Sequence, residues 1–233
     1  MNACIGDADG LGHMRKGELV KSALHLGVRD ESHVTVLDDP SVLLRSIKRS
    51  SSIFAKDLRR NFPDSMTRDW DPELISKLLV EHFKASKDIE ANTNSLAPQN
   101  ILITFDAHGI SSHPNHKSLY RGALHYLKTL PSSAQGSSAT ELYTLRTTSL
   151  PRKYLSFLDA PFTILSNLLS ITGPEEEFPG KSLVFVNSIR EWRRSQKAMT
   201  HAHVSQMRWF RWGWIGLSRY MVVNDLGRVD LGN

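Results

Sequence analysis

A short apolar run that leads into an acidic residue and a histidine loop is the feature that most constrains the fold. Residues Ile101–Phe105 are rich in β-branched and apolar side chains, which predicts a buried strand, and Asp106 follows at its carboxyl end. His113 and His116 come next, in a segment of Gly, Ser and Pro. Parallel α/β sheets bind ligands beyond the carboxyl ends of their strands. We therefore expect a functional site here, where a metal-assisted hydrolase would place its imidazoles.

The rest of the chain alternates between predicted helices and predicted strands. Gly27 predicts the end of the first helix, and Asp71 followed by Pro72 predicts the start of another, with Asp as the N-cap. The alternation predicts an α/β layer fold with a largely parallel sheet. Residues 41–61 are basic, contain several serines and lack periodicity, which predicts an insertion. The expected helices are 13–26, a segment from 72, 116–127 and a region from 189, and the expected strands are 34–37, 101–105, 141–146 and 183–186.

Composition limits the class of protein. The 233 residues are 40% hydrophobic, enough to bury a core. The net charge of +5 suits an anionic surface such as phospholipid headgroups or a phosphate, and no known nucleic-acid motif is present, so we expect no nucleic-acid partner. The single cysteine, Cys4, excludes an intrachain disulfide and a cysteine-based zinc site. The sequence has no run of about 18 uninterrupted apolar residues, so it predicts no membrane-spanning helix. The segment Leu155–Ile171 comes closest to such a run.

The two histidines, taken alone, allow two interpretations. Neutral imidazoles bind zinc well, and a catalytic zinc takes three protein ligands and a water whose pKa it lowers to about 7. Two surface histidines in a loop would give the same spacing. The position of His113 and His116 after a strand that ends in Asp106 favours a site.

Three other segments also have two interpretations. The loop Gly6–Gly12 predicts either a phosphate cradle or a tight turn. Arg15 either pairs with Glu18 along a helix or reaches a phosphate or sugar hydroxyl. The segment 203–214, with three tryptophans and two arginines within seven residues, predicts either a membrane interface or a core helix with exposed arginines. His203 itself would be either a polar core residue or a sugar contact.

An ordered set of motifs, from near residue 5 to about residue 226, resembles the N-acetylglucosaminyl-phosphatidylinositol de-N-acetylases. The order makes the set much more specific than any single motif. Asp7 stands where the family has Asn. The matching residues are Gly6–Gly12 with Arg15, Glu18 and Leu19; Thr104–Asp106 with Gly109–His116; Arg152–Tyr154 with Leu158–Asp159; and His203, Ser205, Gln206, Trp209–Arg211 and Ser218–Met221.

The resemblance implies a zinc-dependent amidase on a Rossmann-like three-layer domain, acting in the second step of glycosylphosphatidylinositol (GPI) anchor synthesis. It implies a glycolipid substrate, a membrane surface as partner and the cytoplasmic face of the endoplasmic reticulum as location. By the same resemblance His116 is a zinc ligand, and His113 acts at the tetrahedral intermediate with Asp106 as support of the histidine loop. Arg15 and His203 would contact the sugar or phosphate of the substrate.

One family segment has no counterpart in the 233 residues. The family carries His-Pro-Asp-Asp-Glu after its first strand, which supplies a His and an Asp to the metal and another Asp as general base, whereas the only His-Pro here is His113–Pro114. We therefore expect residues 1–233 to be a single, N-terminally truncated domain without the first strand. Two functions stay open: a de-N-acetylase, whose activity in this form is in question because the segment is missing, and a catalytically dead, membrane-peripheral glycolipid-binding protein.

Overall fold

The computed structural model describes residues 11–34, 36, 62, 65–90, 100–130, 140–168 and 182–229. Most of the predicted loop Gly6–Gly12 and all of the predicted insertion at 41–61 lie outside this part. Across the described residues, no helix combines the length and apolar character needed to cross a bilayer. The chain divides into two compact units. We call them the histidine unit (described residues within 37–147 and 227–229) and the arginine unit (described residues within 11–36, 148–168 and 182–226).

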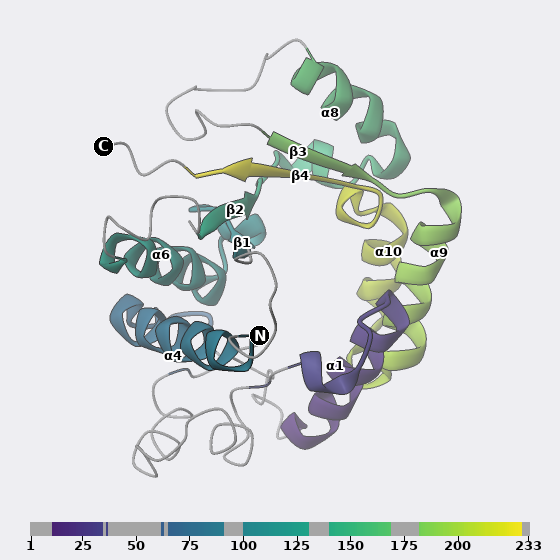
Figure 1. The fold of residues 1–233 in the computed structure, drawn as a ribbon. Helices are drawn as coiled ribbons and strands as arrows, with labels where there is room; N and C mark the ends of the chain where they lie inside the picture. The colour runs from purple at the N-terminus through teal and green to yellow at the C-terminus, as the bar shows by residue number, and fades with distance from the viewer. Residues whose placement is uncertain are drawn as a thin grey trace. The chain divides into compact units, whose positions relative to one another are not determined.

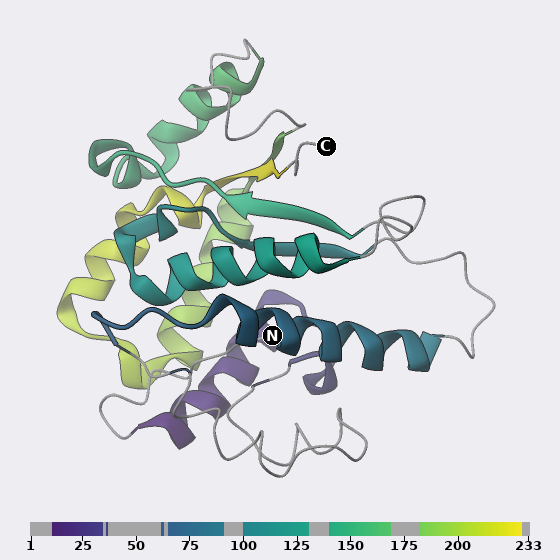
Figure 2. The same cartoon turned by 90° about the vertical axis from the view of Figure 1, so that its left-hand side faces the viewer.

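The histidine unit is built on a strand–helix–strand crossover. Strands β1 (Ile101–Phe105) and β2 (Glu141–Leu145) pair in parallel, with Ile101 opposite Glu141 and Phe105 opposite Leu145. The short helix α5 (Gly109–Ser112) and helix α6 (Pro114–Thr129) connect them. Helix α6 packs against β1, and α4 (Pro72–Glu90) packs against α6 (Figures 1 and 2). This crossover confirms the α/β class and a parallel strand pair.

Helix α4 begins where the sequence predicts it. Asp71 Oδ1 accepts a hydrogen bond from the Glu73 N–H at 2.9 Å, which satisfies a backbone donor of the first turn. The helix continues to Glu90. Close contact with α6 depends on Gly122, where an added Cβ would lie 2.4 Å from Ile75 Cβ.

The prediction that Ile101–Phe105 is a buried strand is right about the strand and wrong about its burial. Ile101 is 54% exposed and Ile103 is 58% exposed. The hydrogen-bonded strand order is β1-β2-β4-β3, so β1 is an edge strand. Its burial alternates along the first residues because helix α6 covers one face of it. The Rossmann-like arrangement and a missing first strand stay predictions.

The other two strands are β3 (Ser182–Val186) and β4 (Val223–Arg228). Strand β3 matches the predicted strand at 183–186. Strand β4 was not predicted, because its sequence, Val-Asn-Asp-Leu-Gly-Arg, has neither apolar alternation nor a continuous apolar run. Its residues up to Leu226 belong to the arginine unit, and Gly227 and Arg228 belong to the histidine unit. Val36 forms an isolated bridge where a strand was expected at 34–37.

The arginine unit contains most of the helical segments. Its first helix, α1 (Gly12–Leu26), confirms the predicted helix, and Gly27 ends it with a φ of 103°. Helix α9 (Ile189–Lys197) starts with a capping box between Ser188 and Glu191. Helix α1 packs against α9 and against the π-helical turn η5 (Ala198–Ala202). The remaining segments are η2 (Glu31–His33), α7 (Leu150–Lys153), η4 (Ser156–Leu158), α8 (Asp159–Leu168), η6 (Val204–Gln206), α10 (Trp209–Leu217) and η7 (Arg219–Met221).

A buried ion network lies inside the arginine unit. Arg219 is fully buried, its Nε contacts the Asp159 carboxylate, and its Nη1 donates to Asp225 Oδ1 at 3.0 Å. Thr163 Oγ1 accepts from Arg219 Nη2 at 2.7 Å and donates to Asp159 at 2.9 Å. Arg152 Nε donates to the other Asp159 oxygen at 2.7 Å. The network joins α7, α8, η7 and β4, so these family-type motif residues have a structural role.

Substituting Arg219 tests this role. Arg219→Met leaves buried carboxylates without their main partner, so we expect the free energy of unfolding to fall by about 3–5 kcal/mol in urea titrations. Arg121→Met is the matched control, because Arg121 and Asp69 form an ion pair with both side chains about half exposed (51% and 54%), and such a pair contributes about 0–1 kcal/mol. Equal losses for the two variants would contradict the structural role of the network.

Candidate active site

The carboxyl end of β1 is organised by the buried carboxylate of Asp106. Asp106 Oδ1 accepts from the backbone N–H groups of His108 (3.1 Å) and Gly109 (2.9 Å). Thr147, just beyond β2, donates its N–H to Oδ2 at 2.5 Å and its hydroxyl to Oδ1 at 2.6 Å. Thr147 Oγ1 also accepts from the Ile110 N–H at 2.8 Å. Asp106 thus ties the histidine loop to the ends of two adjacent strands.

The loop after Asp106 has a backbone conformation that residues other than glycine rarely adopt. Gly109, Ile110 and Ser112 all have positive φ values, of 64°, 64° and 57°. A positive φ at a β-branched residue such as Ile110 is strained, and such strain gathers at functional sites. At Gly109 an added Cβ would lie 2.9 Å from His116 Cβ, so the close approach of loop and histidine requires glycine.

His116 lies in the first turn of α6, beside the strand end. Its ring stacks on Phe105 with centroids 3.9 Å apart. Its Nδ1 lies 3.0 Å from the carbonyl oxygen of Gly109. Because a carbonyl oxygen only accepts, this contact assigns the proton of the neutral ring to Nδ1 and the lone pair to Nε2. Zinc-binding histidines make the same kind of hydrogen bond, in which the ring nitrogen that does not bind the metal donates to a carbonyl or carboxylate oxygen.

His113 has the opposite hydrogen bond. It is the N-cap residue of α6, and its Nδ1 accepts from the Asn115 N–H at 3.2 Å. An accepting Nδ1 assigns the proton of the neutral ring to Nε2, which makes Nε2 a donor. The two rings lie together, with centroids 5.1 Å apart. The loop therefore presents a donor imidazole and a ligand-type imidazole side by side.

A zinc centre needs more ligands than this pair. Within the described ranges, no group of three or more His, Cys, Asp or Glu side chains could hold a metal ion. His116 has the hydrogen bond expected of a zinc ligand, but Asp106 is engaged by its four loop and Thr147 donors. The described residues thus do not fit a complete zinc site, and we assign no step to a metal.

The other two predicted site residues lie in the arginine unit. Arg15 is on α1 and His203 precedes η6, and these segments are joined by Glu18, which is only 8% exposed. The Glu18 carboxylate accepts from the Ser205 N–H at 2.7 Å and from the Ser205 hydroxyl at 2.6 Å. The helix face of α1 is therefore anchored by a carboxylate rather than by apolar side chains.

The surroundings of His203 lower the pKa of its ring. Burial lowers the pKa of His203; the nearby Glu18 carboxylate raises it and Arg211 lowers it. Burial also lowers the pKa of Arg211, and the positive charge of Arg15 adds to this effect. Gln206 Nε2 lies 3.3 Å from His203 Nδ1. Arg15, Glu18, His203 and Arg211 thus interact within one unit.

The predicted site residues fall into two sets. His113, His116 and Asp106 come together in the histidine unit, and Arg15 and His203 come together in the arginine unit. Sequence reasoning missed Thr147 and Arg211. Thr147 carried a weak signal, since it follows a predicted strand just as Asp106 does.

Variants near His203 test these electrostatics. We expect the His203 ring to titrate below about 6.5, its ordinary pKa. Arg211→Gln should raise this pKa because it removes a repelling cation, and Glu18→Gln should lower it further because it removes an attracting anion. Ring resonances followed by NMR against pH measure both shifts. Arg208→Gln, the same charge change at an exposed arginine, is the control; an equal shift in that variant would contradict the assignment.

Comparisons with known proteins agree with these motifs. A family model described as GlcNAc-PI de-N-acetylase (PIG-L) matches residues 2–127. The N-acetylglucosaminyl-phosphatidylinositol de-N-acetylase of Arthroderma benhamiae is 44% identical over 246 residues, covering 95% of this chain and 68% of that relative. A probable enzyme of this name from Schizosaccharomyces pombe is 33% identical, covering 96% and 71%, and the one from Bos taurus is 30% identical, covering 92% and 65%. The chain belongs to the GlcNAc-PI de-N-acetylase family.

Proposed function

We propose that this protein removes the acetyl group from N-acetylglucosaminyl-phosphatidylinositol, the reaction in the names of its relatives. This is the second step of GPI anchor synthesis, on the cytoplasmic face of the endoplasmic reticulum membrane, and we propose a Rossmann-like sheet as its scaffold. The observation that supports the proposal best is the opposite hydrogen bonding of His113 and His116.

Hydrolysis of an acetamide joins water to the carbonyl carbon, breaks the C–N bond and releases acetate and an amine. A negative charge develops on the carbonyl oxygen, and the leaving nitrogen takes up a proton. His113 Nε2–H suits the first need, as a donor held in place by its N-cap bond. His116 has the hydrogen bonding of a zinc ligand through its Nδ1 bond to Gly109, but the described residues alone do not complete a zinc site. Asp106 is a positioning residue.

Arg15 and His203 suit the rest of the substrate. A guanidinium binds phosphate oxygens through paired N–H donors, and Arg15 is such a group in a half-buried setting. A neutral imidazole both donates and accepts, as recognition of a sugar hydroxyl requires, and burial favours the neutral form of His203. We propose that the two residues contact the phosphate and the sugar.

Acetate release from the glycolipid tests the proposal. His113→Asn retains an N-cap acceptor for α6 but removes the ring donor, so we expect a normal fold and acetate release reduced by about 10²- to 10⁴-fold. His108→Asn is the matched control, because His108 is an exposed histidine of the same loop. Glycolipid binding without acetate release, with zinc supplied, would instead favour the glycolipid-binding alternative.

Thr147 tests the positioning of the loop. Thr147→Val removes the hydroxyl that donates to Asp106 and accepts from Ile110, so we expect the free energy of unfolding to fall by about 1–3 kcal/mol and acetate release to fall with it. Thr147→Ser retains the hydroxyl and should restore both. Urea unfolding and acetate release measure the pair of variants. Equal values for Val and Ser would contradict the role of the hydroxyl.

A further inference from the structure

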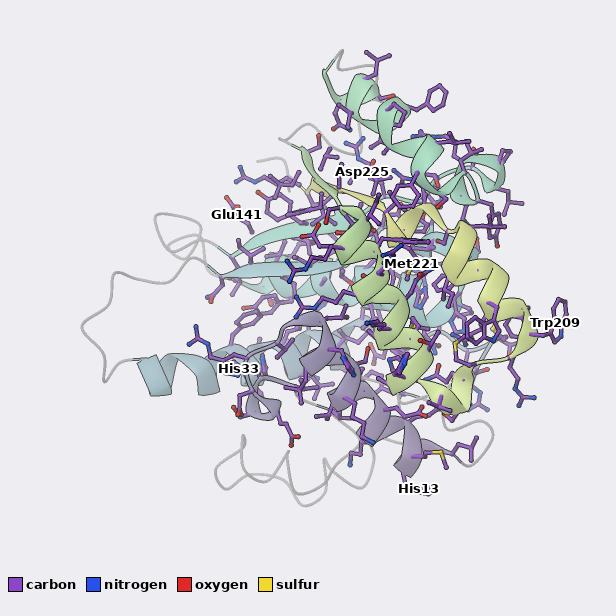
Figure 3. The ribbon with its side chains drawn as sticks, turned by 90° about the vertical axis from the view of Figure 1, so that its right-hand side faces the viewer. His13, His33, Glu141, Trp209, Met221 and Asp225 are labelled. Carbon is purple, nitrogen blue, oxygen red and sulfur yellow. The ribbon has the colours of Figure 1, made fainter. Side chains whose placement is uncertain are left out.

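Helix α10 presents an apolar side where a surface helix normally presents polar residues. Trp209 is 87% exposed, Trp212 58% and Phe210 53%, whereas Ile215 of the same helix is buried. Figure 3 shows Trp209 at the outer end of the helix, pointing away from it. Trp209 and Trp212 are three residues apart and therefore share a face. Such a contiguous exposed patch indicates a binding surface.

A second exposed apolar group lies on η4 and α8. Leu158 is 68% exposed and Phe162 is 60% exposed, four residues apart on neighbouring turns. Asp159 and Thr163 of α8 belong to the buried ion network and anchor this helix on its inner side. The polar side of α8 thus faces inward, and apolar side chains face outward.

The two groups belong to one region of the arginine unit. The Ser156 hydroxyl of η4 donates to the Gly216 carbonyl of α10 at 3.2 Å. Both elements also pack against η7. We call Leu158, Phe162, Trp209, Phe210 and Trp212 the aromatic surface.

The segments that carry the aromatic surface have no exposed acidic side chain. Residues 150–168 contain a single acidic residue, Asp159, which is fully buried in its ion pairs, and residues 208–217 contain none. The guanidinium of Arg152 is partly exposed, and Arg208 is exposed at the start of α10. Tryptophan with arginine is the composition that favours the headgroup layer of a bilayer, and the positive charge complements anionic phospholipids.

We propose that the aromatic surface docks on a bilayer that contains anionic phospholipids, with its rings at headgroup depth. The proposal rests on the proposed function, because a lipid-linked substrate must be reached at a membrane. Its segments 150–168 and 208–217 have no exposed acidic side chain to repel the headgroups, and its exposed aromatic residues lie on α8 and α10. This docking is separate from the contacts of Arg15 and His203 with the substrate.

Sedimentation with sucrose-loaded vesicles tests the docking. The full 233-residue chain should bind phosphatidylcholine vesicles that contain phosphatidylinositol more tightly than pure phosphatidylcholine vesicles. The double variant Trp209→Ser with Trp212→Ser should bind about tenfold more weakly or worse, since each ring contributes buried apolar area, and Leu158→Ser with Phe162→Ser should act in the same direction. Met66→Ser, at a residue 70% exposed in the histidine unit, should bind like the parent chain.

Unchanged vesicle binding in both double variants would overturn the proposal. So would a dimer, seen by light scattering, that the tryptophan variant loses while its vesicle binding persists, because the surface would then join two copies of the chain. Acetate release from a water-soluble headgroup analogue without acyl chains distinguishes a failure of membrane docking from a failure of the proposed deacetylation. We expect the tryptophan variant to retain that release. If the parent chain releases no acetate, the proposed function fails, and vesicle binding still decides the docking.

Discussion

The candidate active site depends on one buried carboxylate. Asp106 receives hydrogen bonds from two backbone N–H groups of the following loop and two donors of Thr147. These bonds hold a loop whose backbone is strained at Ile110 and whose Gly109 allows contact with His116. Stacking on Phe105 and the N-cap bond of His113 then fix the two imidazoles. The hydrogen bonds to this carboxylate offset part of the cost of the strained loop.

The family motifs divide into chemistry and architecture. The histidine motif ends in two rings with opposite proton positions, which suits acid–base and ligand roles. The motifs around Arg152, Asp159 and Arg219 instead meet each other in a buried network. A buried ion pair contributes little net stability, but removing one partner is costly because it leaves an unpaired buried charge.

The arginine unit buries an ion network beside its apolar core and exposes apolar side chains on α8 and α10. Arg219, Asp159 and Thr163 are buried, while Phe162 and Trp209 are exposed. The exposed side chains are the basis of the proposed membrane docking. Burial lowers the pKa of His203 in the same unit, where we propose that it contacts the sugar.

The sequence by itself predicted most of the element types and the ends marked by caps, and it singled out the two histidines that the structure brings together after β1. Gly27, Asp71 and Pro72 act through local backbone chemistry, so their positions could be predicted. Local pattern could not predict β4, the exposure of Ile101 and Ile103, or the role of Thr147. Strand pairing and burial depend on residues far apart in the chain, and Asp106 meets Thr147 only because β1 and β2 pair in parallel. Only the folded loop decided the proton position on His116, because that ring meets the Gly109 carbonyl, whereas the N-cap bond of His113 is local.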